Sequence, residues 1–387
     1  MRSSSSFSTL FARTRARLWK RATLGWLTPL SLLLACVALQ RLAGFQPGFV
    51  ERFYSRGLYF YLGRGISQIS RPFTFSLAEV LMVALPLAGL VRVLVQTRRD
   101  LERGTRHGRI FLARARDLLW FSAVFLALFL VLFGFNYQRL PLRKGLDLSE
   151  RTATTVELET MAIHIISEIN RNFMDAGGTD TSPPRKTENL DRNRLFNSIE
   201  AAFQSTGLLK EAAQGGFAAP KPVFFSRLLS SAGMAGVYSP FTGEPNYNVA
   251  QPANELAFSV AHEKAHQRGY AREDEASFIA FVVCIRADDP YVRYSGFLRG
   301  LRVLTPLQEA IPGERYQKII AALSPGVRAD LQAGAEFWRR ARSVRLGNVA
   351  ERANNTYLRA NSVRSGVRNY GEVVSLIIGY YLTYPPG

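Results

Sequence analysis

The sequence predicts a mainly α-helical protein, with an integral membrane N-terminal region of three transmembrane helices followed by a mostly helical domain with a small β element. Three observations predict this class. Three long apolar runs lie within the first 137 residues, apolar residues at helical spacing recur after them, and one stretch in the middle of the chain is broken by Pro, Gly and Asn. We therefore expect a membrane region at residues 1–137 and a second domain at residues 138–387.

The first apolar run, residues 22–39, is uncharged and is long enough to cross the hydrocarbon core of a bilayer as a helix. A cleaved signal peptide is the alternative, because basic residues precede the run. No small-residue cleavage site follows it, however, and two more apolar runs come later, so an uncleaved anchor is favoured.

The second and third apolar runs span residues 75–95 and 118–135. The second has Glu79 and Arg92 near its ends, where charged side chains can reach the membrane interface. The third is the most hydrophobic. Buried helices of a soluble protein are the alternative for each run, but the flanking arginines, together with Trp26 and Trp120 near the run ends, favour the membrane.

The distribution of basic residues predicts the orientation of these helices. The chain has 49 Lys and Arg against 30 Asp and Glu, a net charge of +19. No basic stripe interleaved with aromatic residues accompanies this charge, so nucleic acid is not expected as a partner. The N-terminal tail and the loop between the second and third runs are the most arginine-rich, and the first loop is less so, which places the tail and the second loop in the cytoplasm. Three crossings then put the domain after about residue 137 outside the cytoplasm, in a multi-pass protein of the inner or plasma membrane.

The second domain is expected to be mostly helical. Residues 154–172 and 194–213 show helical spacing of apolar residues, a Gly/Pro/Ser/Thr-rich loop separates them, and further helices follow as far as Leu382. The punctuated stretch at residues 221–248 predicts short strands or a hairpin. Cys36 and Cys284 lie in apolar segments and form no disulfide framework, so both are expected to be small buried side chains.

The stretch "AHEKAHQRGYAREDEA", residues 261–276, carries the chemistry of the chain. On a helix, His262 and His266 share one face and can present two imidazoles to one point. This is the HExxH arrangement of zinc sites, in which Glu263 turns toward the water that the metal activates and acts as general base. A solvated helix with acid-paired histidines is the alternative. The apolar residues before the motif and Gly269, placed to end the helix, favour a buried metal site.

A zinc ion also needs a third protein ligand, and Glu273, Asp274 and Glu275 follow the motif closely. If residue 272 onward is helical, Glu273 shares a face with small residues such as Ala276, Ser277 and Ala280, which lets this helix approach the motif helix closely. Glu275 heads the bulkier face. This reasoning favours Glu273 and leaves Glu275 open. Acids that only complement the positive end of the helix dipole are the alternative.

The stretches "AHEKAHQRGYAREDEASF", "PFTGEPNYN" and "NNTYLRANSVRSGVRNYGEVVSLIIGYY" resemble a bacterial family catalogued as domain of unknown function 3810, whose members are polytopic membrane proteins of zinc metallopeptidase type. More distantly, the HExxH motif at residues 262–266, followed by a second motif that begins at Glu273, is similar to the pair of motifs in the HtpX-like membrane proteases and the ImmA-type metallopeptidases. That resemblance implies a gluzincin-like domain with Zn²⁺ held by His262, His266 and Glu273. The chain departs from the usual pattern at Ser277, where Asp or Asn is usual.

These observations predict a membrane-anchored, zinc-dependent metallopeptidase whose partners are the lipid bilayer and a protein or peptide substrate. A catalytically idle membrane scaffold or regulator with a structural metal site is the alternative, and a transporter or channel is disfavoured because the apolar runs hold few polar residues. His107 and His164 are expected to be ordinary residues. Any of three tyrosines could donate to an oxyanion, although a packing role is favoured for each: Tyr357, Tyr370 and Tyr380.

Overall fold

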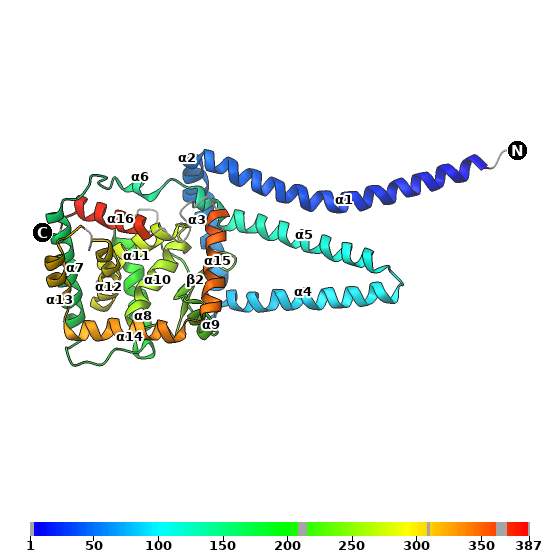
Figure 1. The fold of residues 1–387 in the computed structure, drawn as a ribbon. Helices are drawn as coiled ribbons and strands as arrows, with labels where there is room; N and C mark the ends of the chain where they lie inside the picture. Colours follow the sequence, from blue (N-terminus) through cyan, green and yellow to red (C-terminus); the bar gives the residue numbers. More distant parts are fainter. Residues whose placement is uncertain (1–3, 208–214, 308–309, 361–369, 386–387) are drawn as a thin grey trace.

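A computed structural model describes residues 4–207, 215–307, 310–360 and 370–385 of the chain. The described residues are mostly helical and include one three-stranded sheet, which confirms the predicted fold class. Three long helices project from one side of a helical domain (Figure 1).

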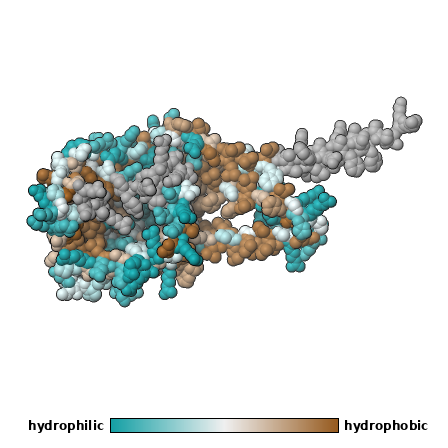
Figure 2. All heavy atoms as spheres, in the orientation of Figure 1, coloured by the Kyte–Doolittle hydropathy of each residue, from teal (hydrophilic) through white to brown (hydrophobic). Residues whose placement is uncertain are grey.

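The projecting helices are α1 (Ser4–Phe45), α4 (Leu77–Glu102) and α5 (His107–Leu132). Residues Gly25–Phe45 of α1 and the whole of α4 and α5 are long and apolar enough to cross a membrane. Their side chains are almost all unburied and form the brown arms that leave the domain in Figure 2. The prediction of three such helices is therefore confirmed. Hydropathy marks the part of a helix that fits a membrane and not the helix end, which is why α5 begins well before the predicted residue 118.

The connection between α1 and α4, treated above as a loop, is helical and packs against the domain. Its central segment η1 is a π-helix, and Tyr59 at the start of the following helix is almost completely buried. Polar and apolar residues alternate irregularly here, so no single period predicted a helix. The connection comprises α2 (Pro47–Phe49), η1 (Val50–Leu58) and α3 (Tyr59–Ser70).

The core of the domain is made by helices that pack α7 on α12, α12 on α11, and α11 on α10. Ile165, Ile169, Leu256 and Phe278 are among its fully buried side chains. The helix predicted at residues 154–172 is confirmed as α7. These four core helices are α7 (Thr155–Asp175), α10 (Ala253–Gln267), α11 (Glu273–Ile285) and α12 (Pro290–Leu307).

The helix predicted at residues 194–213 is shorter than expected. It is α8 (Arg192–Ser205), and residue Gly207 follows it in the left-handed region at φ 57°. Glycine in that conformation commonly ends helices, so the apolar spacing that continues beyond it does not extend α8. Residues 208–214 lie outside the described part of the chain.

The sheet lies beside α10 and confirms the predicted β element. Its order is β1-β3-β2, with β1 (Lys221–Val223) parallel to β3 (Glu244–Asn248) and β2 (Gly236–Ser239) antiparallel to β3. β3 is fully buried between its neighbours, whereas β2 is an edge strand. Gly243, in the tight turn before β3, adopts φ 65°, a conformation that favours glycine.

Shorter elements complete the domain around this core. The last of them, α16, packs on α11 and confirms helical structure as far as Leu382. They are η2 (Gly134–Gln138), α6 (Leu142–Leu146), η3 (Thr187–Asn189), α9 (Ser226–Ala232), α13 (Gly313–Ala321), α14 (Pro325–Ala341), α15 (Val344–Ala360) and α16 (Tyr370–Thr383).

Candidate metal centre

Helix α10 is buried between α11, α12 and β3, and it carries the HExxH residues. It ends where predicted: Gly269 follows its last turn with φ 86°, and the N–H of Tyr270 returns to the carbonyl of Ala265. His262 and His266 lie one turn apart, with ring centroids 4.7 Å apart. The reversal at Gly269 brings the start of α11 back toward this pair.

Three side chains converge at this point. Nε2 of His262 lies 3.1 Å from Nε2 of His266 and 3.1 Å from Oε2 of Glu273, and Nε2 of His266 lies 3.7 Å from the same oxygen. Ligand atoms at the corners of a zinc tetrahedron, with bonds of about 2.0–2.1 Å, lie about 3.3–3.4 Å apart. The spacing and the donor types therefore fit one face of such a tetrahedron.

Hydrogen bonds on the far side of each imidazole orient it toward this point. Nδ1 of His266 donates to the carbonyl of Tyr270 over 2.7 Å, and Nδ1 of His262 lies 3.2 Å from the hydroxyl of Ser277. A proton on Nδ1 of each ring would leave both Nε2 lone pairs available to a metal ion. Such outer contacts fix the tautomer of metal-binding histidines. Ser277, the position at which the chain departs from the related motifs, thus contacts the histidine itself.

The charges at the centre are strongly coupled. Burial raises the pKa of Glu273, but hydrogen bonds from His262 and His266 prevail and hold it well below its usual range. Burial lowers the pKa of His266, yet the hydrogen bond to Glu273 and its charge raise it to about 9. The His266 imidazolium and the Glu273 carboxylate therefore stabilise each other, and a divalent cation could take the place of the imidazolium proton between them.

Glu263 occupies a separate position from the three converging side chains. It is buried, and this burial is the main cause that raises the pKa of its carboxyl to about 8. Its carboxylate accepts a hydrogen bond from the backbone N–H of Tyr238 on β2. A Cβ atom at Gly236, also on β2, would lie 2.8 Å from Cγ of Glu263. The edge strand is thus in direct contact with the motif glutamate.

The two other acids of the second motif point elsewhere. Glu275 is 2% exposed and one of its oxygens accepts a hydrogen bond from the backbone N–H of Leu142 over 2.7 Å. Burial, together with the neighbouring acids Glu275 and Glu372, raises the pKa of Asp274 to about 7. Of the acids left open by the sequence, the structure places Glu273 with the histidines and Glu275 against the start of α6.

Residues near the projecting helices pack against the centre. The ring of Phe133, just after α5, packs against His266 and Tyr238, and the hydroxyl of Tyr59 donates to the carbonyl of Gln267. Arg139 forms a buried ion pair with Glu51 and lies over the ring of Tyr270. Sequence reasoning missed Tyr59 and Arg139, because each reaches the motif through contacts with residues more than 125 positions away.

Other residues considered from the sequence lie away from the centre. His164 lies on α7 and packs between the rings of Phe297 and Tyr381. His107 is the first residue of α5. The hydroxyl of Tyr380 accepts a hydrogen bond from Arg286, and its ring packs on Phe278, which agrees with a packing role. The side chains of Tyr357 and Tyr370 lie outside the part of the chain that the structure describes.

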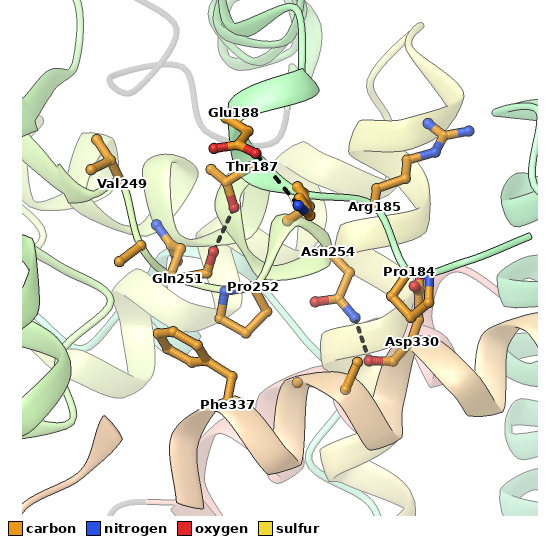
Figure 3. A pocket seen from close by; sticks show the side chains of 15 residues that line it. Pro184, Arg185, Thr187, Glu188, Val249, Gln251, Pro252, Asn254, Asp330 and Phe337 are labelled. Carbon is orange, nitrogen blue, oxygen red and sulfur yellow. Dashed lines mark hydrogen bonds and ion pairs between the residues drawn. The ribbon is translucent and has the colours of Figure 1, made fainter. Parts of the chain in front are cut away.

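A cavity of about 450 Å³ lies at the opposite end of α10 from the histidines (Figure 3). Asn254 and Gln251 line it on one side and Phe337 of α14 on the other. Thr187 donates to the carbonyl of Gln251, and Asn254 donates to the carbonyl of Asp330. None of the motif residues lines this cavity, so we do not assign the chemistry of the centre to it.

Comparison with known proteins gives one match. A family model described as "Protein of unknown function (DUF3810)" matches residues 54–378. No curated protein and no solved structure matches the chain.

Proposed function

Because the chain belongs to the family described as protein of unknown function (DUF3810), we propose its function from its own site: a membrane-anchored, zinc-dependent metallopeptidase that hydrolyses peptide bonds. One observation carries the proposal, namely the convergence of His262, His266 and Glu273 within 3.7 Å beside the buried carboxyl of Glu263. A site with three protein ligands and a neighbouring base is typical of catalytic zinc.

Each residue has a distinct role in this proposal. His262, His266 and Glu273 would hold zinc, and zinc supplies a Lewis acid that lowers the pKa of a water to about 7. Glu263 takes a proton from the attacking water and passes it to the leaving amine. The carboxyl is already oriented for this by the N–H of Tyr238. The Glu273 side chain is 43% exposed, so the centre is open to a substrate on that side.

Strand β2 supports a polypeptide substrate. The N–H of Asn248 donates to the carbonyl of Ala235, so in this antiparallel register Val237 and Ser239 direct their backbone groups toward β3. Gly236 and Tyr238 then direct theirs toward the outer edge of β2, where the N–H of Tyr238 already bonds Glu263. An extended peptide could pair with the other backbone groups of that edge as an added strand and would be held beside Glu263.

The orientation is part of the same proposal. The arginine-rich tail and the α4–α5 connection favour a cytoplasmic N-terminus, with the domain outside the cytoplasm and the chain crossing the inner or plasma membrane three times. The same proposal divides the chain into a membrane region at residues 1–137 and a metallopeptidase domain at residues 138–387.

A catalytically idle scaffold or regulator with a structural metal site is the second candidate. Its supporting observation is the pair of buried contacts that link the centre to the projecting helices, Phe133 on His266 and Tyr59 on Gln267. A structural zinc site has four protein ligands and needs no base. The open side at Glu273 and the retention of Glu263 favour the enzyme.

Metal analysis and hydrolysis together test the proposal. Purified wild-type protein should contain zinc in near-equal molar amount and should cleave a quenched fluorescent unfolded polypeptide. Glu263→Gln should keep the zinc and lose the cleavage, because the amide cannot accept the proton. Glu314→Gln, a change at an exposed glutamate on α13, serves as the control and should keep both. If both proteins bind zinc and Glu263→Gln cleaves as fast as wild type, Glu263 is not the general base. If the proteins bind zinc and none of them cleaves, the scaffold is favoured.

A further inference from the structure

The start of α4 is anchored to the domain at a defined place. Ser76 caps the helix by accepting from the N–H of Glu79, and the carboxylate of Glu244 on β3 accepts from the N–H groups of Leu77 and Ala78 at 3.3 and 2.9 Å. Glu244 is completely buried. An anion at the positive end of a helix is a stabilising arrangement, so the level at which α4 leaves the domain is set by the fold.

The apolar length of α4 then sets the level of the bilayer. Residues 77–95 contain only Glu79 and Arg92 as charged residues and extend about 28 Å as a helix. The hydrocarbon core of a bilayer is about 30 Å thick. A bilayer that covers this apolar stretch must therefore begin close to the first turn of α4, with Glu79 at the interface.

A second segment of the chain is held at the same level. The carboxylate of Glu79 accepts hydrogen bonds from the backbone N–H groups of Phe224 and Phe225, at 2.8 and 2.6 Å. These two residues form the turn between β1 and α9. The acid in the first turn of α4 therefore fixes an aromatic pair beside the entry of the helix into the membrane.

The side chains of this turn are turned outward. Phe224 is 85% exposed and Phe225 46% exposed, and their ring centroids lie 5.2 Å apart; Leu228, in the first turn of α9, is 55% exposed. A cluster of this kind is unfavourable in water but is favourable at the boundary between lipid headgroups and acyl chains.

We propose that Phe224, Phe225 and Leu228 form a membrane-contact surface, in which the two rings enter the boundary between lipid headgroups and acyl chains beside α4. The partner is lipid, because the continuity with α4 through Glu79 leaves the rings level with the start of its apolar stretch. This second attachment holds the domain against the membrane. The proposal stands independently of the metallopeptidase activity.

Depth measurement on the full chain in lipid nanodiscs tests this surface. Single nitroxide labels are placed by Phe224→Cys and Leu228→Cys, in a background in which the buried Cys36 and Cys284 are replaced by Ala. Met174→Cys is the matched control, because Met174 is an exposed apolar residue, 66% accessible, on α7 at the end of the domain away from the projecting helices (Figure 1). Collision rates with oxygen, which concentrates in lipid, and with a water-soluble nickel chelate are compared.

The expected result is a rise in the ratio of oxygen to nickel collisions at 224 and 228 relative to 174. A ratio at both positions equal to that at 174 would overturn the proposal. Spin–spin broadening at 224 that depends on the number of protein copies per disc, with no gain in oxygen collisions, would also overturn it by assigning the surface to a second copy of the chain. Two labelled positions guard against a single substitution that perturbs the turn.

Discussion

The hydroxyl of Ser277 lies 3.2 Å from Nδ1 of His262, on the side of the ring opposite to Glu273. In the proposed zinc site this hydroxyl would orient the ring of His262, at the position where the related motifs carry Asp or Asn. We predict that Ser277→Ala lowers the affinity for zinc by about 10–100-fold, the usual effect of losing such a contact. Competition with a chelator of known affinity measures this. Ser205→Ala, on α8, should leave the affinity unchanged, and an equal loss in both variants would exclude a specific role for Ser277.

The identity of the third ligand can be decided by metal content. Glu273→Gln should leave the protein zinc-poor, because the neutral amide is a weak ligand for zinc. Glu275→Gln should keep nearly full zinc occupancy, since the Glu275 side chain accepts a hydrogen bond from the N–H of Leu142 and lies away from the histidines. Elemental analysis of both purified variants provides the comparison, and the reverse result would assign the role to Glu275.

Gly236 is required by the close approach of β2 to the motif helix. A Cβ atom there would lie 2.8 Å from Cγ of Glu263 and 2.9 Å from the backbone carbonyl of Asn246, which cannot move aside. Gly236→Ala should therefore destabilise the domain by about 1–3 kcal/mol, the usual cost of overpacking. Thermal unfolding measures the change. Gly313→Ala meets no atom within 4 Å and should have little effect, so equal stability of the two variants would contradict the close contact.

An ion cluster holds the polar side of the motif helix. Glu200 on α8 pairs with the buried cations Lys264 and Arg268, each at 2.7 Å. Removing one partner of a buried pair leaves unpaired charge, so Glu200→Gln should cost about 3–5 kcal/mol at neutral pH. Chemical denaturation measures it. The exposed pair of Lys186 and Glu188 provides the control, because Glu188→Gln should cost less than about 1 kcal/mol.

The same glutamate makes the stability sensitive to acid. Burial raises the pKa of Glu200, but Arg268 and Lys264 prevail and lower it from 4.5 to about 2. A depressed pKa in the folded state contributes stability above pH 4.5 that is lost as the pH falls toward 2. The difference in stability between wild type and Glu200→Gln should therefore shrink over this window. A difference that stays constant from pH 7 to pH 3 would contradict the assigned ion pair.

The proposed topology predicts opposite accessibility on the two sides of the membrane. Single cysteines introduced by Asn189→Cys and Arg103→Cys, in a background lacking Cys36 and Cys284, place exposed thiols in the domain and in the α4–α5 connection. An impermeant thiol reagent added to intact cells should label position 189 and not position 103. Both should react after the membrane is permeabilised. If position 103 alone is labelled from outside, the orientation is the reverse of the proposed one.

The sequence by itself determined the elements whose causes are local. An apolar run of sufficient length predicts a membrane-crossing helix wherever it lies, and a spacing of four places His262 and His266 on one face of any helix. Gly269 ends α10 because its left-handed conformation needs no partner elsewhere in the chain. The face of α11 that carries Glu273 followed from the same periodicity. Each of these inferences depends on residues within a few turns of one another.

Tertiary structure alone decided the contacts that join distant segments. The N–H of Tyr238 on the Glu263 carboxylate, the hydroxyl of Tyr59 at the end of α10 and the bond from Leu142 to Glu275 span tens to hundreds of residues. No period or motif in one sequence encodes such a pairing, because each partner is an ordinary polar or aromatic residue in its own segment. Only the packing of the helical connection, the sheet and α11 around α10 brings the partners within hydrogen-bonding distance, and that packing is a property of the whole fold.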